Sequence, residues 1–315
     1  MLDCAIIGGG PAGLSAGLYT TRGGLKSVTL FEMGLPGGQI TQSSEIENYP
    51  GVFREDPPVT GMELMEAWQP QCFHFGLKHE MKKVERVAKR GEYFTIMLEG
   101  GESVESKTAI VCTGSTPKRA GFKGEDEFFG RGVSTCATCD GFFYKGKPVT
   151  VLGGGDTALE EAYYLSNIVS DVYLVHRRDT FRAAPSTVDR VMKKDNIHLV
   201  LDSIIEEAIG DATGLQAVKV KNLKTGEEKI LETPGLFVFV GHNVNNEVLK
   251  DPSGNFICEM NEWGQVIVDL NMRTSLPGLF VAGDLRIEAP KQVVSAAGDG
   301  TVAALQVISY IQEQS

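Results

Sequence analysis

A glycine-rich turn occurs twice in this chain, each time between an apolar strand-like run and a helical run. Residues 8–13 (GGGPAG) follow the apolar run 4–7, and residues 153–158 (GGGDTA) follow the apolar run 149–152. Glycines allow the tight turn and let the backbone approach a pyrophosphate, which the free N–H groups of the next helix then bind. The repeat predicts an α/β chain with two Rossmann-like nucleotide-binding domains, each of the three-layer ββα type.

The strand that follows each turn ends in residues of opposite charge. Glu32 follows the run 27–31, whereas the run 172–178 contains His176, Arg177 and Arg178, with Arg182 shortly after. A carboxylate accepts a hydrogen bond from a ribose 2′-hydroxyl, while guanidinium groups bind a 2′-phosphate. We therefore expect a nucleotide with a free 2′-hydroxyl in the first pocket and NADP in the second. The alternative is a solvated charge run beside a turn that only packs against the sheet.

The C-terminal region predicts the occupant of the first pocket. Residues 278–284 are predicted as a strand ending in Gly-Asp, and a helix is expected to begin near Gly298. A dinucleotide contacted by both ends of the chain fits FAD, whose ribityl chain Asp284 would bind. The alternative is that Asp284 only caps a helix.

If the C-terminal region returns to the first domain, the second domain is an insertion. We expect an FAD domain at 1–116 and 245–315, with an NADPH domain at 117–244. The runs 109–117 and 237–243 each look like a strand that ends in glycine and is followed by a polar stretch, so they are interpreted as the two hinge strands. Further strands are expected at 93–98 and 216–223.

Composition limits the class of protein. Of 315 residues, 42% are hydrophobic and 23% charged, with 30 Lys and Arg against 41 Asp and Glu, for a net charge of −11. Such an acidic surface argues against nucleic-acid or membrane binding. No apolar run reaches the roughly 18 residues of a membrane helix. With no signal peptide expected before residues 3–10 and only six cysteines, the prediction is a cytoplasmic protein.

Two cysteines stand three positions apart in residues 134–143 (STCATCDGFF), at Cys136 and Cys139. Such a pair can bind a metal, brace a fold or carry electrons. A closed zinc site needs four ligands, but the other cysteines are single and the histidines form no tight pair, so no metal is expected. Cys4 and Cys112 lie in apolar runs and are expected to be buried.

These features together resemble a known family. The motifs are GGGPAG at 8–13, GGQI at 37–40, ENYPG at 47–51, CATCDG at 136–141, GGGDTALEEA at 153–162, HRRDTFRA at 176–183 and the GD…KQV block at 283–293. Over essentially its whole length, the chain resembles the bacterial low-molecular-weight thioredoxin reductases. The resemblance implies FAD in the first domain, NADPH in the second, thioredoxin as the protein substrate, and a homodimer.

The resemblance also implies which residues form the sites. The expected FAD-binding residues are Gly8, Gly10, Pro11, Ala12, Gly13, Glu32, Gly37, Gly38, Gln39, Asn48, Thr113, Gly114, Asp284, Lys291, Gln292 and Val293. The expected NADPH-binding residues are Gly153, Gly154, Gly155, Asp156, Thr157, His176, Arg177, Arg178 and Arg182. The family commonly has Asn where this chain has Asp156.

Between a hydride donor and a flavin, the cysteine pair is interpreted as a two-electron store. Electrons are expected to pass from NADPH through FAD to the disulfide, and then to thioredoxin by dithiol–disulfide exchange. As in the family, Cys139 is the expected flavin-side sulfur and Cys136 the attacking one. Asp140 is the candidate general acid if burial raises its pKa, the alternative being a helix cap.

The cysteine pair and the NADP pocket fall in the same inserted domain, so they compete for one face of the flavin. The resemblance implies that the domain rotates between half-reactions, about hinges near 114–118 and 241–246. The rival hypotheses are a related flavoprotein reductase that serves another acceptor and a nucleotide sensor with a zinc-braced loop.

Overall fold

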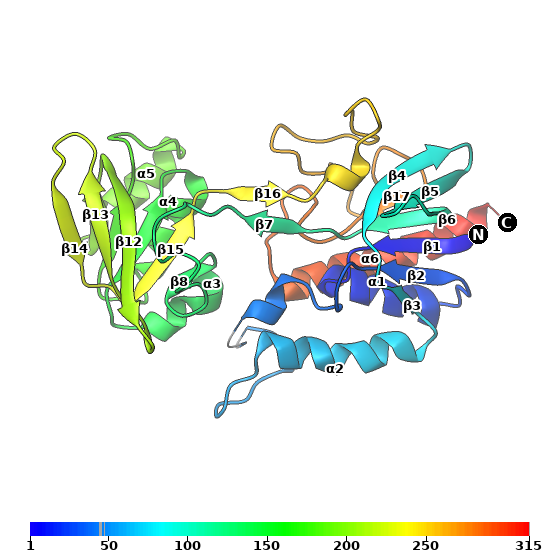
Figure 1. Cartoon of the computed structure of the whole chain (residues 1–315), viewed down its shortest axis with the longest axis horizontal. Coiled ribbons are helices and arrows are strands. Elements are labelled where there is room, and N and C mark those ends of the chain that lie inside the picture. The colour runs from blue at the N-terminus through cyan, green and yellow to red at the C-terminus, as the bar shows by residue number, and fades with distance from the viewer. Residues whose placement is uncertain (44–45, 47, 315) are drawn as a thin grey trace. The chain divides into compact units, whose positions relative to one another are not determined.

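The chain divides into two compact units. The computed structural model describes residues 1–43, 46 and 48–314, so Glu47 of the ENYPG motif lies outside the described residues. Unit 1 comprises Met1–Thr116 and Val244–Ser315, and unit 2 comprises Pro117–Asn243. Unit 2 is therefore inserted between two parts of unit 1, as the colour order in Figure 1 shows.

Unit 1 is built on a sheet in the order β3-β2-β1-β6-β5-β4, with β17 paired to β6. Parallel pairing joins β3, β2, β1, β6 and β17, while β4 and β5 add an antiparallel edge. The strands are β1 (Leu2–Ile7), β2 (Val28–Phe31), β3 (Lys78–Glu80), β4 (Val84–Arg90), β5 (Tyr93–Leu98), β6 (Ser103–Val111) and β17 (Leu279–Val281). The helical elements are α1 (Pro11–Arg22), η1 (Gln39–Gln42), α2 (Gly61–His74), η3 (Glu247–Leu249) and α6 (Val293–Glu313).

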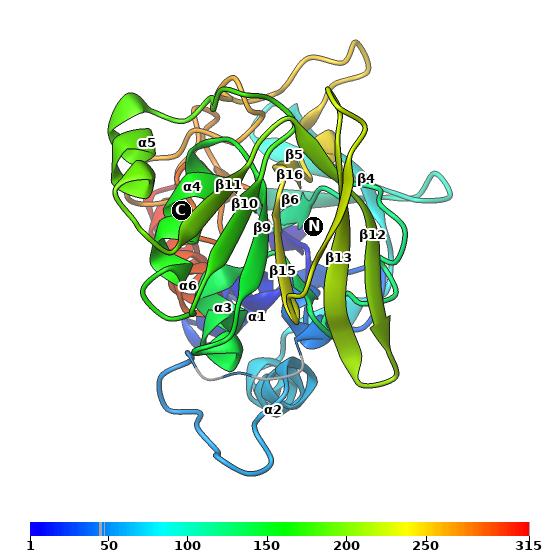
Figure 2. The same ribbon diagram turned by 90° about the vertical axis from the view of Figure 1, so that its left-hand side faces the viewer.

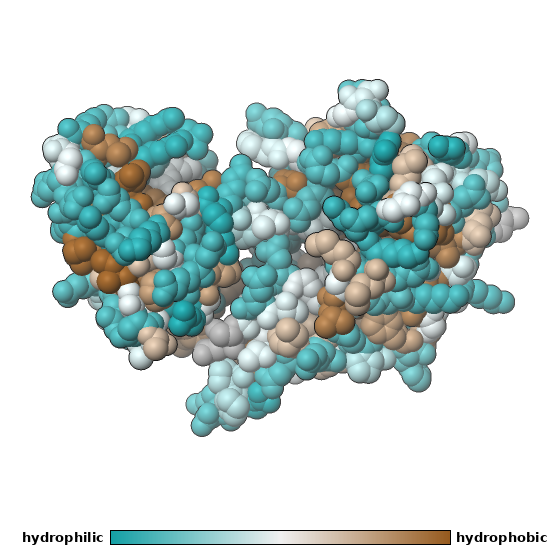
Figure 3. All heavy atoms as spheres, viewed as in Figure 1, coloured by the Kyte–Doolittle hydropathy of each residue, from teal (hydrophilic) through white to brown (hydrophobic). Residues whose placement is uncertain are grey.

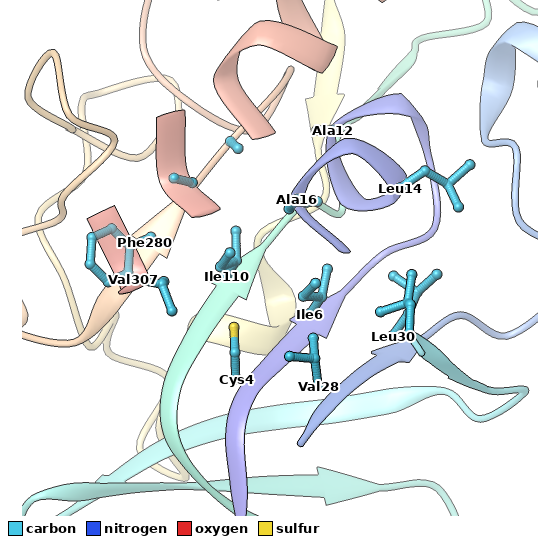
Figure 4. Packing of buried hydrophobic residues seen from close by; sticks show 14 of the residues in the cluster. Cys4, Ile6, Ala12, Leu14, Ala16, Val28, Leu30, Ile110, Phe280 and Val307 are labelled. Carbon is cyan, nitrogen blue, oxygen red and sulfur yellow. The ribbon is translucent and has the colours of Figure 1, made fainter. Parts of the chain in front are cut away.

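The two faces of this sheet carry separate hydrophobic clusters. Along β1, Ile6 belongs to the cluster that also includes Leu14 of α1 and Val307 of α6, whereas Ile7 belongs to the cluster on the other face. Successive strand residues point to opposite faces, so a continuous apolar strand is buried on both. Figure 4 shows the first cluster, with Ile6 and Ile110 between the strands and the helices.

Helix α6 begins at Val293, not near Gly298. The expectation was wrong because Gly298 and Gly300 were read as marking a helix start. A Cβ on Gly300 would lie 2.1 Å from the carbonyl oxygen of Ala12, so glycine there lets α6 pack directly on α1. Packing of this kind overrides the low helix propensity of glycine.

Unit 2 has three layers. A parallel sheet in the order β11-β10-β9-β15-β8 carries helices on one face and the antiparallel sheet β12-β13-β14 on the other, as Figure 2 shows. Leu236 and Val238 of β15 pack toward the antiparallel sheet, while Phe237 between them packs toward the helices. The strands are β8 (Val133–Ser134), β9 (Val149–Gly153), β10 (Val172–Val175), β11 (Ile197–Val200), β12 (Ser203–Asp211), β13 (Gly214–Asn222), β14 (Glu228–Leu231) and β15 (Gly235–Phe239). The helical elements are α3 (Ala137–Asp140), η2 (Gly141–Tyr144), α4 (Asp156–Leu165) and α5 (Pro185–Met192).

The chain crosses between the units on two short strands that pair with each other, β7 (Ser115–Pro117) and β16 (His242–Val244), both labelled in Figure 1. Both crossings begin in the polar second parts of the runs 109–117 and 237–243, which were interpreted as the hinge strands. The apolar first parts of the same runs are the ends of β6 and β15, which are buried core strands of the two sheets. Apolar runs serve as core strands because burial stabilises them, so the crossings fall on the polar residues after each run.

No helix among the described residues is long and apolar enough to cross a membrane. The face drawn in Figure 3 is mostly hydrophilic, with small hydrophobic groups between the polar side chains.

Candidate active site

The first glycine turn connects β1 to α1, and the space beside one of its glycines is not filled by other parts of the protein. A Cβ on Gly8 would lie 2.5 Å from the Cys112 carbonyl oxygen, and one on Gly13 would lie 1.9 Å from the Gly8 carbonyl oxygen. These two glycines are needed for packing. Gly10 is different, because its nearest neighbour is the Gly38 Cα at 3.8 Å. Gly10 therefore leaves space at the start of α1, whose first residues are Pro11 and Ala12.

Glu32 lies directly against this turn. Its carboxylate accepts hydrogen bonds from the backbone N–H of Gly9 at 2.7 Å and of Gly34 at 3.2 Å. Each carboxylate oxygen can accept more than one hydrogen bond. The two backbone donors hold the acid in place, and its remaining acceptor capacity is free for ribose hydroxyls.

The segment around Gly38 lies beside the same turn. The Gly37 N–H donates to the Gly9 carbonyl at 2.8 Å, and a Cβ on Gly38 would lie 2.8 Å from the Gly10 Cα. The Gln39 amide donates to the Ser115 carbonyl. Residues far apart in the sequence thus meet at one site.

Two further contacts bring the C-terminal half of unit 1 to this region. Asn48 donates to the side chain of Gln292 at 3.2 Å, and Gln292 is the N-cap residue of α6, directly after Lys291 and before Val293. At the end of β6, Thr113 donates to the Asn245 carbonyl at 2.6 Å, and the Asn245 amide donates back to Thr113 at 2.9 Å. The Asn245 N–H also donates to the Gly114 carbonyl at 3.0 Å. Asn245, which the sequence analysis missed, therefore binds the end of the second chain crossing to the backbone at Thr113 and Gly114.

The second glycine turn connects β9 to α4. A Cβ on Gly153 would lie 2.5 Å from the Ala158 Cβ, and one on Gly154 would lie 2.1 Å from the His176 ring. Gly155 has no neighbour within 4 Å of such a Cβ, so it is the open position here. The next residues, Asp156 and Thr157, are exposed at the start of α4.

His176 lies beneath this turn. Its side chain is buried, stacks on Phe181 with ring centroids 5.3 Å apart, and hydrogen-bonds the Thr180 carbonyl at 3.2 Å. Burial lowers the pKa of His176, and the positive charges of the neighbouring arginines lower it further. The ring is therefore neutral near pH 7 and supports the backbone that carries the arginines.

Arg177, Arg178 and Arg182 are exposed, and no ion pair joins them to an acid within the described part of the chain. The acid between them, Asp179, is paired instead with Lys224 at 2.9 Å. Three guanidinium groups are thus available for an anion on the rim of the second turn.

Cys136 and Cys139 form a disulfide in unit 2, with their Cα atoms 5.3 Å apart. Strand β8 leads into the pair, and the single turn of α3 begins directly after Cys136. The Ser134 hydroxyl accepts a hydrogen bond from the Cys136 N–H at 3.0 Å, and the Cys136 sulfur lies 3.4 Å from the Thr138 hydroxyl.

Asp140 follows the pair at the end of α3. Burial raises the pKa of its carboxyl, and a hydrogen bond to Ser134 partly opposes that shift. Its side chain makes no capping hydrogen bond to the following turn. These observations favour a proton-transfer role over a helix cap.

The other thiols differ from this pair. Cys4, Cys72, Cys112 and Cys258 are free and buried, and burial raises the pKa of Cys4 to about 12 and of Cys72 and Cys258 to about 11. Thiols with such pKa values stay protonated and unreactive near pH 7. Within the described ranges, no cluster of three potential metal ligands occurs.

Comparison with known proteins decides the family. The family described as pyridine nucleotide-disulphide oxidoreductase matches residues 2–300. The thioredoxin reductase of Helicobacter pylori is 58% identical, with 99% of both chains covered, and that of Peptoclostridium acidaminophilum is 41% identical, covering 98% of this chain and 97% of its own. This chain belongs to the thioredoxin reductase family. The solved thioredoxin reductase of Streptococcus pyogenes has a TM-score of 0.91 at 37% identity, with 99% of both chains covered.

Thioredoxin reductases depend on FAD and NADPH, and the residues present fit both groups. In unit 1, the open position at Gly10 and the anchored Glu32 suit a pyrophosphate and a ribose. Asp284 follows β17, and within the described residues its carboxylate has no hydrogen-bond donor. Burial raises the pKa of Asp284 to about 6. A partly buried carboxylate that accepts no hydrogen bond from the protein suits a ligand that carries hydroxyl groups.

Two residues that the sequence analysis missed hold the turn before Asp284. The Arg286 guanidinium binds the Asp299 carboxylate through two hydrogen bonds of 2.6 and 3.1 Å, and Asp299 also accepts from the Gly283 N–H at 3.2 Å. Asp299 is buried although it lies in α6, an apolar helix. The sequence did contain a signal for this pair, namely an acidic residue within an apolar helix. An acid that is buried almost always has a partner of opposite charge.

We expect Asp284→Asn to stabilise the FAD-free protein above pH 6 and to weaken FAD binding. The folded state holds the pKa near 6 against an ordinary 3.8, so ionisation costs folding free energy that is absent below pH 3.8 and complete above pH 6. Removing the charge should raise the free energy of unfolding by about 2–3 kcal/mol at about pH 8.

Urea unfolding of FAD-free protein at about pH 4 and about pH 8 measures this difference. The exposed Asp189→Asn is the matched control. A stabilisation that is equal at both pH values would contradict the assignment of the shift to Asp284.

Proposed function

We propose that this protein is an NADPH-dependent thioredoxin-disulfide reductase, with FAD bound to unit 1 and NADPH to unit 2. The observation that carries the proposal is the Cys136–Cys139 disulfide, which lies in the unit that also presents the open Gly155 and three unpaired arginines. A disulfide in the same unit as one dinucleotide turn, in a chain with a second such turn, suits a path for two electrons.

When bound, FAD accepts a hydride from NADPH and can pass two electrons to a disulfide. The protein then holds a dithiol. The Cys136 thiolate attacks one sulfur of the oxidised thioredoxin, forming a mixed disulfide and releasing the other thioredoxin sulfur as a thiolate. Cys139 next attacks the Cys136 sulfur, which restores the internal disulfide and releases reduced thioredoxin. Asp140 supplies a proton to a departing thiolate, because burial raises its pKa.

Rotation of unit 2 between the two half-reactions forms part of the proposal. Only β7 and β16 join the units along the chain, and a few residues at such a crossing can absorb the backbone rotation. A homodimer in the cytoplasm is also proposed, on the resemblance to bacterial thioredoxin reductases. Sedimentation of the FAD-loaded protein measures the oligomeric state.

Purified protein tests the proposal directly. We expect a yellow protein whose flavin absorbance is bleached by NADPH, and which oxidises NADPH continuously when oxidised thioredoxin is added. Bleaching without thioredoxin turnover would indicate another acceptor. A colourless protein that contains zinc would indicate a nucleotide sensor instead.

We expect Asp140→Asn to lower thioredoxin turnover by about 10²-fold or more, the usual contribution of a positioned general acid. A general acid works while protonated, so wild-type turnover should fall as the pH rises through the raised pKa of Asp140. The variant should show a low rate without that fall. Turnover measured from about pH 5 to pH 9 checks this, with bleaching of FAD by NADPH as the control that should not change.

A further inference from the structure

Arg177, Arg178 and Arg182 lie on one loop of unit 2, residues 176–184, here called the arginine loop. Two backbone N–H groups of this loop, those of Arg182 and Ala184, donate hydrogen bonds to the second glycine turn. The Arg182 N–H donates to the Gly154 carbonyl at 2.8 Å. Two residues later, the Ala184 N–H donates to the carboxylate of Asp156 at 2.7 Å. The position of Arg182 relative to the turn is therefore set by these two bonds.

The other end of the arginine loop has separate anchors. The Asp202 N–H donates to the Arg178 carbonyl at 3.2 Å, and the Ser203 N–H donates to the His176 carbonyl at 2.9 Å. Lys224 pairs with both Asp179 and Asp202, at 2.9 and 3.0 Å. Arg177 and Arg178 are thus held by bonds that do not involve Asp156. On the Arg182 side of the loop, the Asp156–Ala184 bond is one of the two bonds to the glycine turn.

Asp156 is the first residue of α4, where the turn is expected to bind the pyrophosphate of NADPH. A free carboxylate there would repel that group. Its hydrogen bond to Ala184 gives the charge a partner and at the same time holds the arginine loop. Charge-assisted hydrogen bonds of this kind are stronger than neutral ones.

We propose that Asp156 is a positioning residue for nucleotide selectivity, acting through the Ala184 N–H to hold Arg182 at the 2′-phosphate site. This inference rests on the proposed function, because it takes the second turn to bind NADPH. Its contribution is to recognition of the 2′-phosphate, and the rest of the nucleotide is bound without it.

The test measures binding of 2′,5′-ADP and 5′-AMP to the FAD-loaded protein by calorimetry. The two ligands differ only in the 2′-phosphate, and neither is turned over. For Asp156→Ala we expect the preference for 2′,5′-ADP to fall by about tenfold, the lower end for loss of a charge-assisted contact. Asp156→Asn keeps an oxygen acceptor for the Ala184 N–H and should retain most of the preference.

Ala184→Pro is the matched variant from the other partner. Ala184 has φ −56°, which proline adopts, so the substitution removes the N–H donor at a backbone φ that the proline ring allows. It should lower the preference at least as much as Asp156→Ala. The double variant should be no worse than the single ones, because both remove the same bond.

The outcomes separate the inference from the proposed function. If the wild-type protein binds both ligands equally, the NADPH assignment fails and the inference fails with it. If the wild-type protein prefers 2′,5′-ADP and Asp156→Ala keeps that preference, only the inference is overturned. The same holds if Asp156→Ala weakens both ligands equally, as a purely structural role would, or if it strengthens 2′,5′-ADP binding, as a repelling charge would.

Discussion

Replacing Cys136 or Cys139 with serine is expected to abolish thioredoxin reduction while leaving the reduction of bound FAD by NADPH intact. Each residue supplies one sulfur of the only disulfide among the described residues. Without either sulfur, the internal disulfide cannot form, so there is no store from which two electrons can be exchanged onto thioredoxin. The rate of NADPH oxidation with thioredoxin and the bleaching of flavin absorbance measure the two activities separately.

Cys258→Ser is the control for this pair. Its thiol is buried, burial raises its pKa to about 11, and it lies in unit 1. We expect the FAD-loaded control to keep its thioredoxin turnover. A Cys136→Ser or Cys139→Ser protein that reduces thioredoxin at the wild-type rate would show that the disulfide is not the electron store.

Replacing Arg177 and Arg178 together with alanine is expected to raise the KM for NADPH by about 10²-fold or more, since each charge-assisted contact contributes about 1.5–3 kcal/mol. The KM for NADH should change little, because NADH has no 2′-phosphate. Both side chains are exposed and without an acidic partner in the described part of the chain. Their loss therefore leaves no buried charge unpaired. Steady-state kinetics with the two nucleotides measures the effect.

Lys193→Ala removes one exposed positive charge from the same unit, outside the arginine loop, and controls for the overall electrostatic field of the protein. It should leave both KM values unchanged. An unaltered ratio of the NADPH and NADH KM values in the double arginine variant would contradict the assignment of this pocket to NADPH.

The sequence alone was enough to find the two dinucleotide turns and the cysteine pair. These features depend on local chemistry. Glycine is required where Gly8 and Gly13 meet neighbouring backbone, and a strand followed by a helix is readable from the apolar pattern. The disulfide likewise joins residues only three positions apart. The family could be recognised from these motifs, because their order and spacing are preserved along the chain.

What the tertiary structure decided depends on contacts between distant segments. The start of α6 was misplaced because the close packing of Gly300 on Ala12 cannot be read from either segment alone. The pairing of β7 with β16 joins two segments far apart in the chain, and the runs 109–117 and 237–243 do not show that pairing by themselves.

The residues that hold the binding residues in place could not be predicted from the sequence either. The Arg286–Asp299 pair spans 13 positions and the Asp156–Ala184 bond spans 28. Local sequence determines which residue types can bind a nucleotide. Only the fold determines which side chains hold them in place, because a hydrogen bond forms at about 3 Å regardless of separation along the chain.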